Sequence, residues 1–249
     1  MADEHQLSSR ELITTARRLM RGSATSWGSL TGQLEVRNDE PWLDEGRKRY
    51  HGSAALETST TSEISVVGYS FAVVKTPWRV RMQLMHSSAA GEPEPHPDLI
   101  IYRDQEWWAR TGSELKTNST NVAHHGLYGL ELMICPQPLA DILYYEEARE
   151  RIGERAAILV SAAASEMAIQ HAPELVVLSV SRYELEVDRE LDILLANRAY
   201  IDNRIARDIV LHDIRVDVPL DDETEFGIPK LPTITGLAPG QTRDHEHEY

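Results

Sequence analysis

The chain has 249 residues, of which 41% are hydrophobic, so it holds enough apolar material for a core and is not expected to be disordered as a whole. Its formal net charge is −15, and residues 126–249 hold most of it, with 24 acids against 11 bases. A field of this sign repels phosphate backbones, so we expect no binding to nucleic acid.

The beginning of the chain carries neither the basic nor the apolar segment of a secretory signal. No stretch approaches the roughly 18 apolar residues of a membrane-spanning helix, so we expect no integral membrane segment. If the chain is complete we expect a cytoplasmic protein, and if its start has been removed, an extracytoplasmic one. The single cysteine, Cys135, excludes an intramolecular disulfide and lies in an apolar run, which favours a buried, inert thiol.

The first predicted element is a helix that ends near Gly22. Ser8 and Glu11 have the spacing of a capping box, in which each side chain accepts a hydrogen bond from the backbone N–H of the other residue. A strand is predicted at residues 29–37. The polar residues 38–62 indicate a long loop or a short helix.

Strand patterns dominate the middle of the chain. Residues 78–84 alternate apolar against polar, which is the period of a half-buried strand. The prolines of residues 91–97 remove hydrogen-bond donors and fix φ, so we expect an exposed loop there. Further strands are predicted at residues 64–74, 99–102 and 106–110, the last two joined by a tight turn at 103–105.

The second half is expected to return to strands after a polar loop at residues 111–126 and a helix at residues 136–152. Serial strands joined by short turns pair antiparallel, because parallel pairing needs a crossover between them. We therefore expect one α+β domain over residues 1–228 and a disordered acidic, His-containing tail at 229–249. Strands are predicted at residues 156–161, 175–181, 182–187, 193–201 and 204–218.

The sequence lacks the common catalytic motifs, among them the glycine-rich nucleotide loops, the HExxH zinc motif and the GxSxG elbow. His124 and His125 form the pair most like a site, but adjacent histidines on an irregular loop rarely share one metal. We expect no catalytic residue, no metal and no cofactor, and therefore no enzyme.

The candidate binding surface lies on the strand at residues 78–84 and its neighbours. The apolar side chains of this strand have one parity, so they are expected on one face of the sheet. An indole joins a large apolar area to one N–H, which suits the mouth of a hydrophobic cavity, although each tryptophan can equally fill the core. The predicted cavity-lining residues are Trp78, Val80, Met82, Leu84, Ile100, Tyr102 and Trp107.

Four segments of the chain follow a known order: Leu-Thr-Gly-Gln-Leu-Glu-Val at 30–36, Thr-Pro-Trp-Arg-Val-Arg-Met at 76–82, a strand, turn and strand at 99–109, and a strand-rich stretch at 155–226. In this order they resemble the superfamily of the lipoprotein carrier LolA and the sigma-factor regulator RseB. The resemblance implies a strongly curved antiparallel sheet, or half β-barrel, with an N-terminal helix and a mid-chain helix over its concave face. Gln105 stands where the family normally has glycine, which implies a different turn geometry.

The resemblance and the apolar face together favour a non-catalytic protein that holds a lipid-like or other hydrophobic ligand, such as an acyl chain, in the half-barrel. The alternative is a protein-interaction or regulatory module of the RseB type, in which the chain's own helices fill the half-barrel and a protein partner binds the surface. A third hypothesis is an enzyme that uses His124 or His125.

Overall fold

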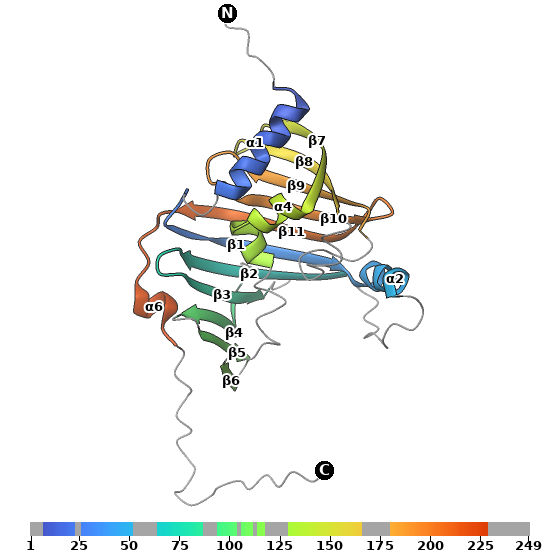
Figure 1. Cartoon of the computed structure of the whole chain (residues 1–249). Coiled ribbons are helices and arrows are strands. Elements are labelled where there is room, and N and C mark those ends of the chain that lie inside the picture. Colours follow the sequence, from blue (N-terminus) through green and yellow to red (C-terminus); the bar gives the residue numbers. More distant parts are fainter. Residues whose placement is uncertain are drawn as a thin grey trace, which may run out of the picture.

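The computed structural model describes residues 7–22, 26–51, 64–86, 94–103, 106–111, 114–117, 129–165 and 180–228 (Figure 1). These residues form one antiparallel sheet and several helices. The helices with defined bounds are α1 (Ser9–Gly22), α2 (Glu40–His51), α4 (Gln137–Ile142) and α6 (Asp222–Phe226). The strands are β1 (Ser29–Asp39), β2 (Ile64–Val74), β3 (Arg79–His86), β4 (Glu94–Arg103), β5 (Glu106–Thr111), β6 (Glu114–Thr117), β7 (Leu143–Arg151), β8 (Ala157–Ala164), β9 (Arg182–Asp188), β10 (Leu194–Ile201) and β11 (Arg204–Val216).

The sheet has 11 strands in the order β6-β5-β4-β3-β2-β1-β11-β10-β9-β8-β7. Strands β1 to β6 follow one another across one half of the sheet. Strands β7 to β11 return across the other half until β11 pairs antiparallel with β1. Because β6 and β7 stand at two separate edges, the sheet is open and does not close into a barrel.

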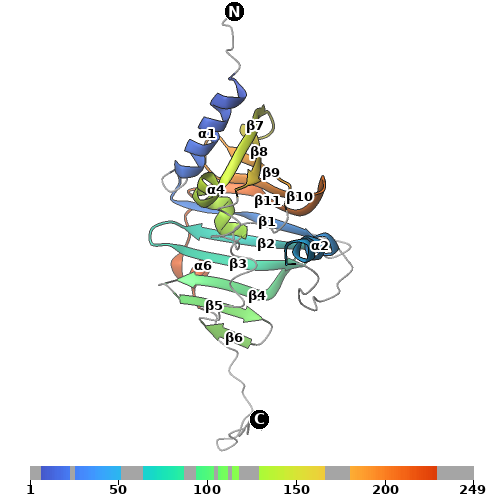
Figure 2. The same ribbon diagram turned by 45° about the vertical axis from the view of Figure 1, so that its right-hand side comes forward.

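The helices α1 and α4 lie on the concave face of this sheet (Figures 1 and 2). α1 packs on β7, β8 and β9, and α4 packs on α1. A helical turn at residues 129–134 adds three fully buried side chains to the same core. This arrangement confirms the expected α+β class, with a curved antiparallel sheet, an N-terminal helix and a mid-chain helix over its concave face.

α1 begins with the predicted capping box. The backbone N–H of Ser8 donates to Glu11 Oε2 at 2.8 Å, and the backbone N–H of Glu11 donates to Ser8 Oγ at 3.4 Å. The two bonds satisfy donors that have no partner inside the helix. The buried face of α1 consists of Leu12, Ala16, Leu19 and Met20.

The short helix α6 covers part of the opposite, convex face, where it packs on β3 and β4. Asp221 caps it by accepting a 2.8 Å hydrogen bond from the backbone N–H of Thr224. Phe226, the last residue of α6, is fully buried. Arginines of the two strands pair with its acids: Arg79 with Asp222, Arg81 with Glu225 and Arg103 with Glu223.

The helix predicted at residues 136–152 is wrong in its second half. α4 ends at Ile142, and the backbone of Leu143 is already extended, with φ −91° and ψ 147°. From there the chain continues as β7, which pairs with β8 along its length. The backbone bonds to β8 therefore outweigh the helix propensity of the Glu, Ala and Arg residues in this segment.

The loops predicted at residues 91–97 and 111–126 are also partly wrong, because β4 begins at Glu94 and β6 occupies Glu114–Thr117. Pro95 is paired with Met85 of β3, past an irregularity in the register. β5 pairs with β4 only from Leu99 onward, so the first residues of β4 have a partner strand on one side alone. Proline is tolerated at such an edge position because the missing N–H would face no partner.

Residues 175–179 of the strand predicted at 175–181 lie outside the described residues, as does the tail at 229–249. The domain extent of residues 1–228 stays a prediction. None of the helices in the described ranges is long and apolar enough to cross a membrane.

Candidate functional site

The predicted binding residues of β3 and β4 do share one face of the sheet. Val80 is paired with Tyr102, and Met82 is paired with Ile100, in the regular antiparallel register that places opposed side chains on the same side. This side is the concave one, because all four residues belong to the main core cluster or pack against it. The alternation of residues 78–84 was thus sufficient to predict which side chains face the same way.

Burial divides these residues into two groups. Val80 and Met82 are 0% and 1% exposed, so they belong to the packed core. Leu84, Ile100 and Tyr102 are half-buried and offer apolar surface. Substituting Met82 with a charged residue would therefore report on folding before it reported on ligand uptake.

The two predicted tryptophans have different outcomes. Trp78 is half-buried and packs against the core, but it lies in the turn before β3 and not on the strand. β5 places the backbone of Trp107 opposite Tyr102, while the side chain of Trp107 lies outside what the structure describes.

The half-buried group continues into β2 as a row of side chains. Leu84 is paired with Tyr69, which is also half-buried and packs against the core. In Figures 1 and 2 the strands β3 to β6 lie below α1 and α4. We call Tyr69, Leu84, Ile100 and Tyr102 the apolar row.

Sequence reasoning missed three polar residues on the same concave face. Arg207 is directly opposite Asn38, and Asn197 is opposite Ile209, so all three have the parity of core residues. The alternation of Arg207 with Ile209 and Leu211 along β11 was the available signal, since it places an arginine at an inward position.

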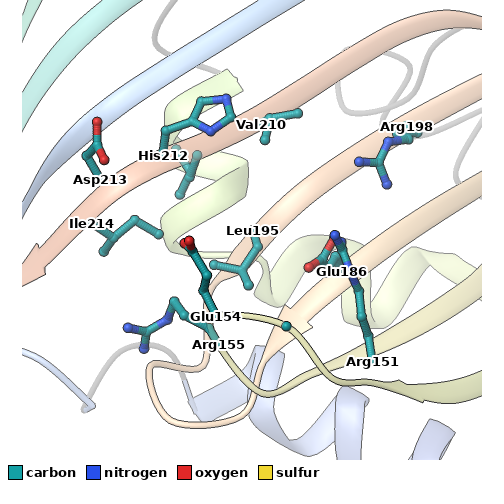
Figure 3. Close-up of a pocket in the computed structure, with 12 residues that line it drawn as sticks. Arg151, Glu154, Arg155, Glu186, Leu195, Arg198, Val210, His212, Asp213 and Ile214 are labelled. Atoms are coloured by element: carbon teal, nitrogen blue, oxygen red, sulfur yellow. The ribbon is translucent and has the colours of Figure 1, made fainter.

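The convex face carries a polar pocket of about 570 Å³ at the ends of β7 to β11 (Figure 3). Its cationic side chains are paired with acids. Arg151 pairs with Glu186, and Arg155 pairs with the fully buried Asp188. Arg198 lies 3.4 Å from Glu184 Oε1 and 3.3 Å from Asp208 Oδ1.

These ion pairs argue against an anion-binding site in the pocket. Each cation already has a carboxylate partner, so little positive charge is left for an anionic ligand. Burial raises the pKa of Asp208 above its ordinary value even though Arg198 lowers it. We interpret the pocket as an ion-pair network that ties β7 to β11 together.

The structure also shows where the candidate reactive groups lie. His124 and His125 are outside the described residues. Among the described residues no group of three or more His, Cys, Asp or Glu side chains is placed to hold a metal ion. Cys135 is half-buried, and its pKa is raised, chiefly by burial and against the effect of Lys75. A raised pKa keeps the thiol protonated and unreactive.

No protein-family model matches the sequence, and neither does any curated protein. Among solved structures, MucB has a TM-score of 0.48 at 11% identity, over 87% of this chain and 62% of MucB. LprF from Mycobacterium bovis has a TM-score of 0.46 at 10% identity, over 90% of this chain and 98% of LprF. A LolA superfamily protein from Nitrosomonas europaea has a TM-score of 0.32 at 8% identity, over 88% of this chain and 97% of that protein.

One of these three structures is named as a LolA superfamily protein. The chain spans about three fifths of MucB. The TM-scores of all three structures are below 0.5.

Proposed function

We propose that this chain is a non-catalytic binding protein and that a hydrophobic ligand lies along the apolar row. The observation that carries the proposal is the continuity of this row with the core. Leu84 and Ile100 stand on the same face as the buried Met82, yet remain half-buried. Two helices of the concave side pack away from the apolar row, α1 on β7 to β9 and α4 on α1.

The energetics suit a flexible apolar ligand. Each methylene removed from water contributes about 0.8 kcal/mol, so ten of them contribute about 8 kcal/mol before the cost of association. That cost is on the order of 4 kcal/mol or more, so ten methylenes leave about 4 kcal/mol, which is millimolar binding. Micromolar binding needs about fifteen carbons, roughly the length of a palmitoyl tail.

A second candidate is the protein-interaction module, and one observation favours it. Leu130, Met133 and Ile134 are fully buried in the same core cluster as Leu34 and Leu211, so the chain's own helical turn fills part of the concave side. If this filling extended over the apolar row, the chain would act through its surface on a protein partner. Such a protein would not take up small hydrophobic molecules.

Uptake of N-phenyl-1-naphthylamine, a neutral probe that fluoresces in apolar surroundings, distinguishes the two functions. Leu84→Glu places a carboxylate in the apolar row, while Gln83→Glu places the same group one residue earlier on the convex face. We expect saturable uptake by the unmodified protein and by Gln83→Glu, and at least tenfold weaker uptake by Leu84→Glu, because a charge in an apolar site is costly.

Two results would contradict the proposal. The first is the absence of saturable uptake by the unmodified protein, which favours the interaction module. The second is equal uptake by both variants, which places the probe elsewhere. Circular dichroism of both variants provides the control for folding.

A further inference from the structure

Three polar side chains form a cluster on the concave face, at the end of the central strands beside α2. Arg207 of β11 is opposite Asn38 of β1, and Asn197 of β10 is the diagonal neighbour of Arg207. We call these three residues the polar cluster. They share their face with Val36 and Ile209, which belong to the core.

The polar cluster lacks partners within the described part of the chain. Nε of Arg207 and Oδ1 of Asn38 are buried there without a hydrogen bond. Asn197 is only 8% exposed, and its amide makes no hydrogen bond with any described residue. The convex arginines Arg151 and Arg155 each have a carboxylate partner, whereas no described carboxylate pairs with Arg207.

An unpaired, largely buried guanidinium is unfavourable for folding alone. Burial lowers the pKa of Arg207, and the weak attraction of Tyr183 and Glu40 does not reverse the effect. The carboxylate of Glu40 accepts a hydrogen bond from Ser65 and forms no ion pair with Arg207 in the described structure. Arginine nevertheless stays charged in proteins, so the cluster retains a cation that an anion would stabilise.

We propose that the polar cluster binds the anionic head of a single-chain amphiphile whose tail lies along the apolar row. This inference rests on the proposed function and adds the chemistry of the ligand. A guanidinium and two amides offer several N–H donors to the oxygens of a carboxylate or a phosphate. Their position inside the concave face, and not on the surface, favours an amphiphile over a small free anion.

The spacing of the two sites fits this ligand. Arg207 of β11 is three strands away from Leu84 of β3. Across the strands, Leu34 of β1 is aligned with Tyr69 and Leu84. Asn38, which is opposite Arg207, lies four residues further along β1. With about 4.8 Å between strands and about 3.4 Å per residue, the two sites are roughly 20 Å apart along the sheet. The side chain of Val67, opposite Val36, is half-buried and lies between them.

The test compares palmitate, whose sixteen-carbon chain is long enough to span the two sites, with its methyl ester, each displacing N-phenyl-1-naphthylamine from the protein. The ester keeps the tail and loses the charge. Arg207→Met keeps an unbranched apolar side chain and removes the cation, and Arg37→Met makes the same substitution at an exposed residue of the opposite face. Probe uptake by each variant shows that the concave face is still formed.

We expect the unmodified protein and Arg37→Met to bind palmitate at least tenfold more tightly than methyl palmitate. In Arg207→Met this preference should disappear, through a loss of about ten- to a hundredfold in palmitate affinity, as expected for a charge-assisted hydrogen bond. Uptake of the neutral probe should stay unchanged. Arg207→Met should also melt at a higher temperature than the unmodified protein without ligand, because the unpaired buried charge is gone.

Other outcomes overturn the inference. If palmitate and methyl palmitate bind the unmodified protein equally, or if Arg207→Met keeps the preference, no anion is bound at the polar cluster. If millimolar inorganic phosphate displaces palmitate but not the probe, the site accepts a free anion and not an amphiphile. Failure of the neutral probe to bind the unmodified protein would instead refute the proposed function, so the two failures are distinguishable.

Discussion

Asp188 is the residue whose removal should weaken the folded sheet most clearly. Its carboxylate is fully buried, pairs with Arg155, and accepts 2.8 Å hydrogen bonds from the backbone N–H groups of Glu190 and Leu191. Asp188→Ala leaves these donors unsatisfied, and removing one partner of a buried pair costs about 3–5 kcal/mol. Asp188→Asn keeps an oxygen for the two N–H groups, so we expect a smaller loss of about 1–3 kcal/mol.

Urea unfolding of the unmodified protein, Asp188→Ala and Asp188→Asn measures these losses as differences in the free energy of unfolding. Glu190→Ala is the control, because Glu190 is 79% exposed and lies 3.5 Å from the same arginine. We expect it to cost less than about 1 kcal/mol, as surface ion pairs do. Equal losses for Asp188→Ala and Glu190→Ala would refute the idea that burial and the two backbone bonds make Asp188 important.

Three further measurements test the environments of single residues. Burial raises the pKa of Glu131 above its ordinary value of 4.5, so the folded protein loses stability as rising pH ionises this carboxyl group. Glu131→Gln should therefore raise the melting temperature at pH 8 but not at pH 3, and an equal gain at both pH values would contradict this. The raised pKa of Cys135 should make its alkylation by iodoacetamide at pH 8 at least tenfold slower in the folded than in the urea-unfolded protein, and equal rates would disprove the assignment. Phe226→Ala should cost about 3–5 kcal/mol in urea unfolding by leaving a cavity under α6, whereas a loss below about 1 kcal/mol would mean that α6 is not docked on β3 and β4.

Where local chemistry and packing agree, the sequence was sufficient to predict the structure. Ser8 and Glu11 predicted the start of α1, because a capping box depends only on residues within one turn. The alternation in residues 78–84 predicted the strand β3 and its face, because one side of that strand is buried. The hairpin between β4 and β5 followed from two strand patterns separated by a short polar turn.

The errors occur where pairing with a distant strand decides. Residues 143–151 are charged and helix-forming, yet β8 provides their hydrogen-bond partners and they form β7. Pro95 can lie in β4 because β5 pairs with β4 only from Leu99 onward and needs no N–H from Pro95. No local sequence pattern reveals this. For the same reason it could not be predicted that Arg207 has no carboxylate partner among the described residues, since this depends on which side chains of β1 and β10 lie beside it.

The proposed function places a hydrophobic ligand on the concave face of β2 to β4. Photo-crosslinking with a fatty acid that carries a diazirine in its tail, followed by mass spectrometry of the modified peptides, tests this claim. We predict adducts on Tyr69, Leu84, Ile100 or Tyr102, which face the concave side. Adducts confined to convex-face residues such as Gln83 and Ile101, or adducts spread evenly over the surface, would contradict the claim.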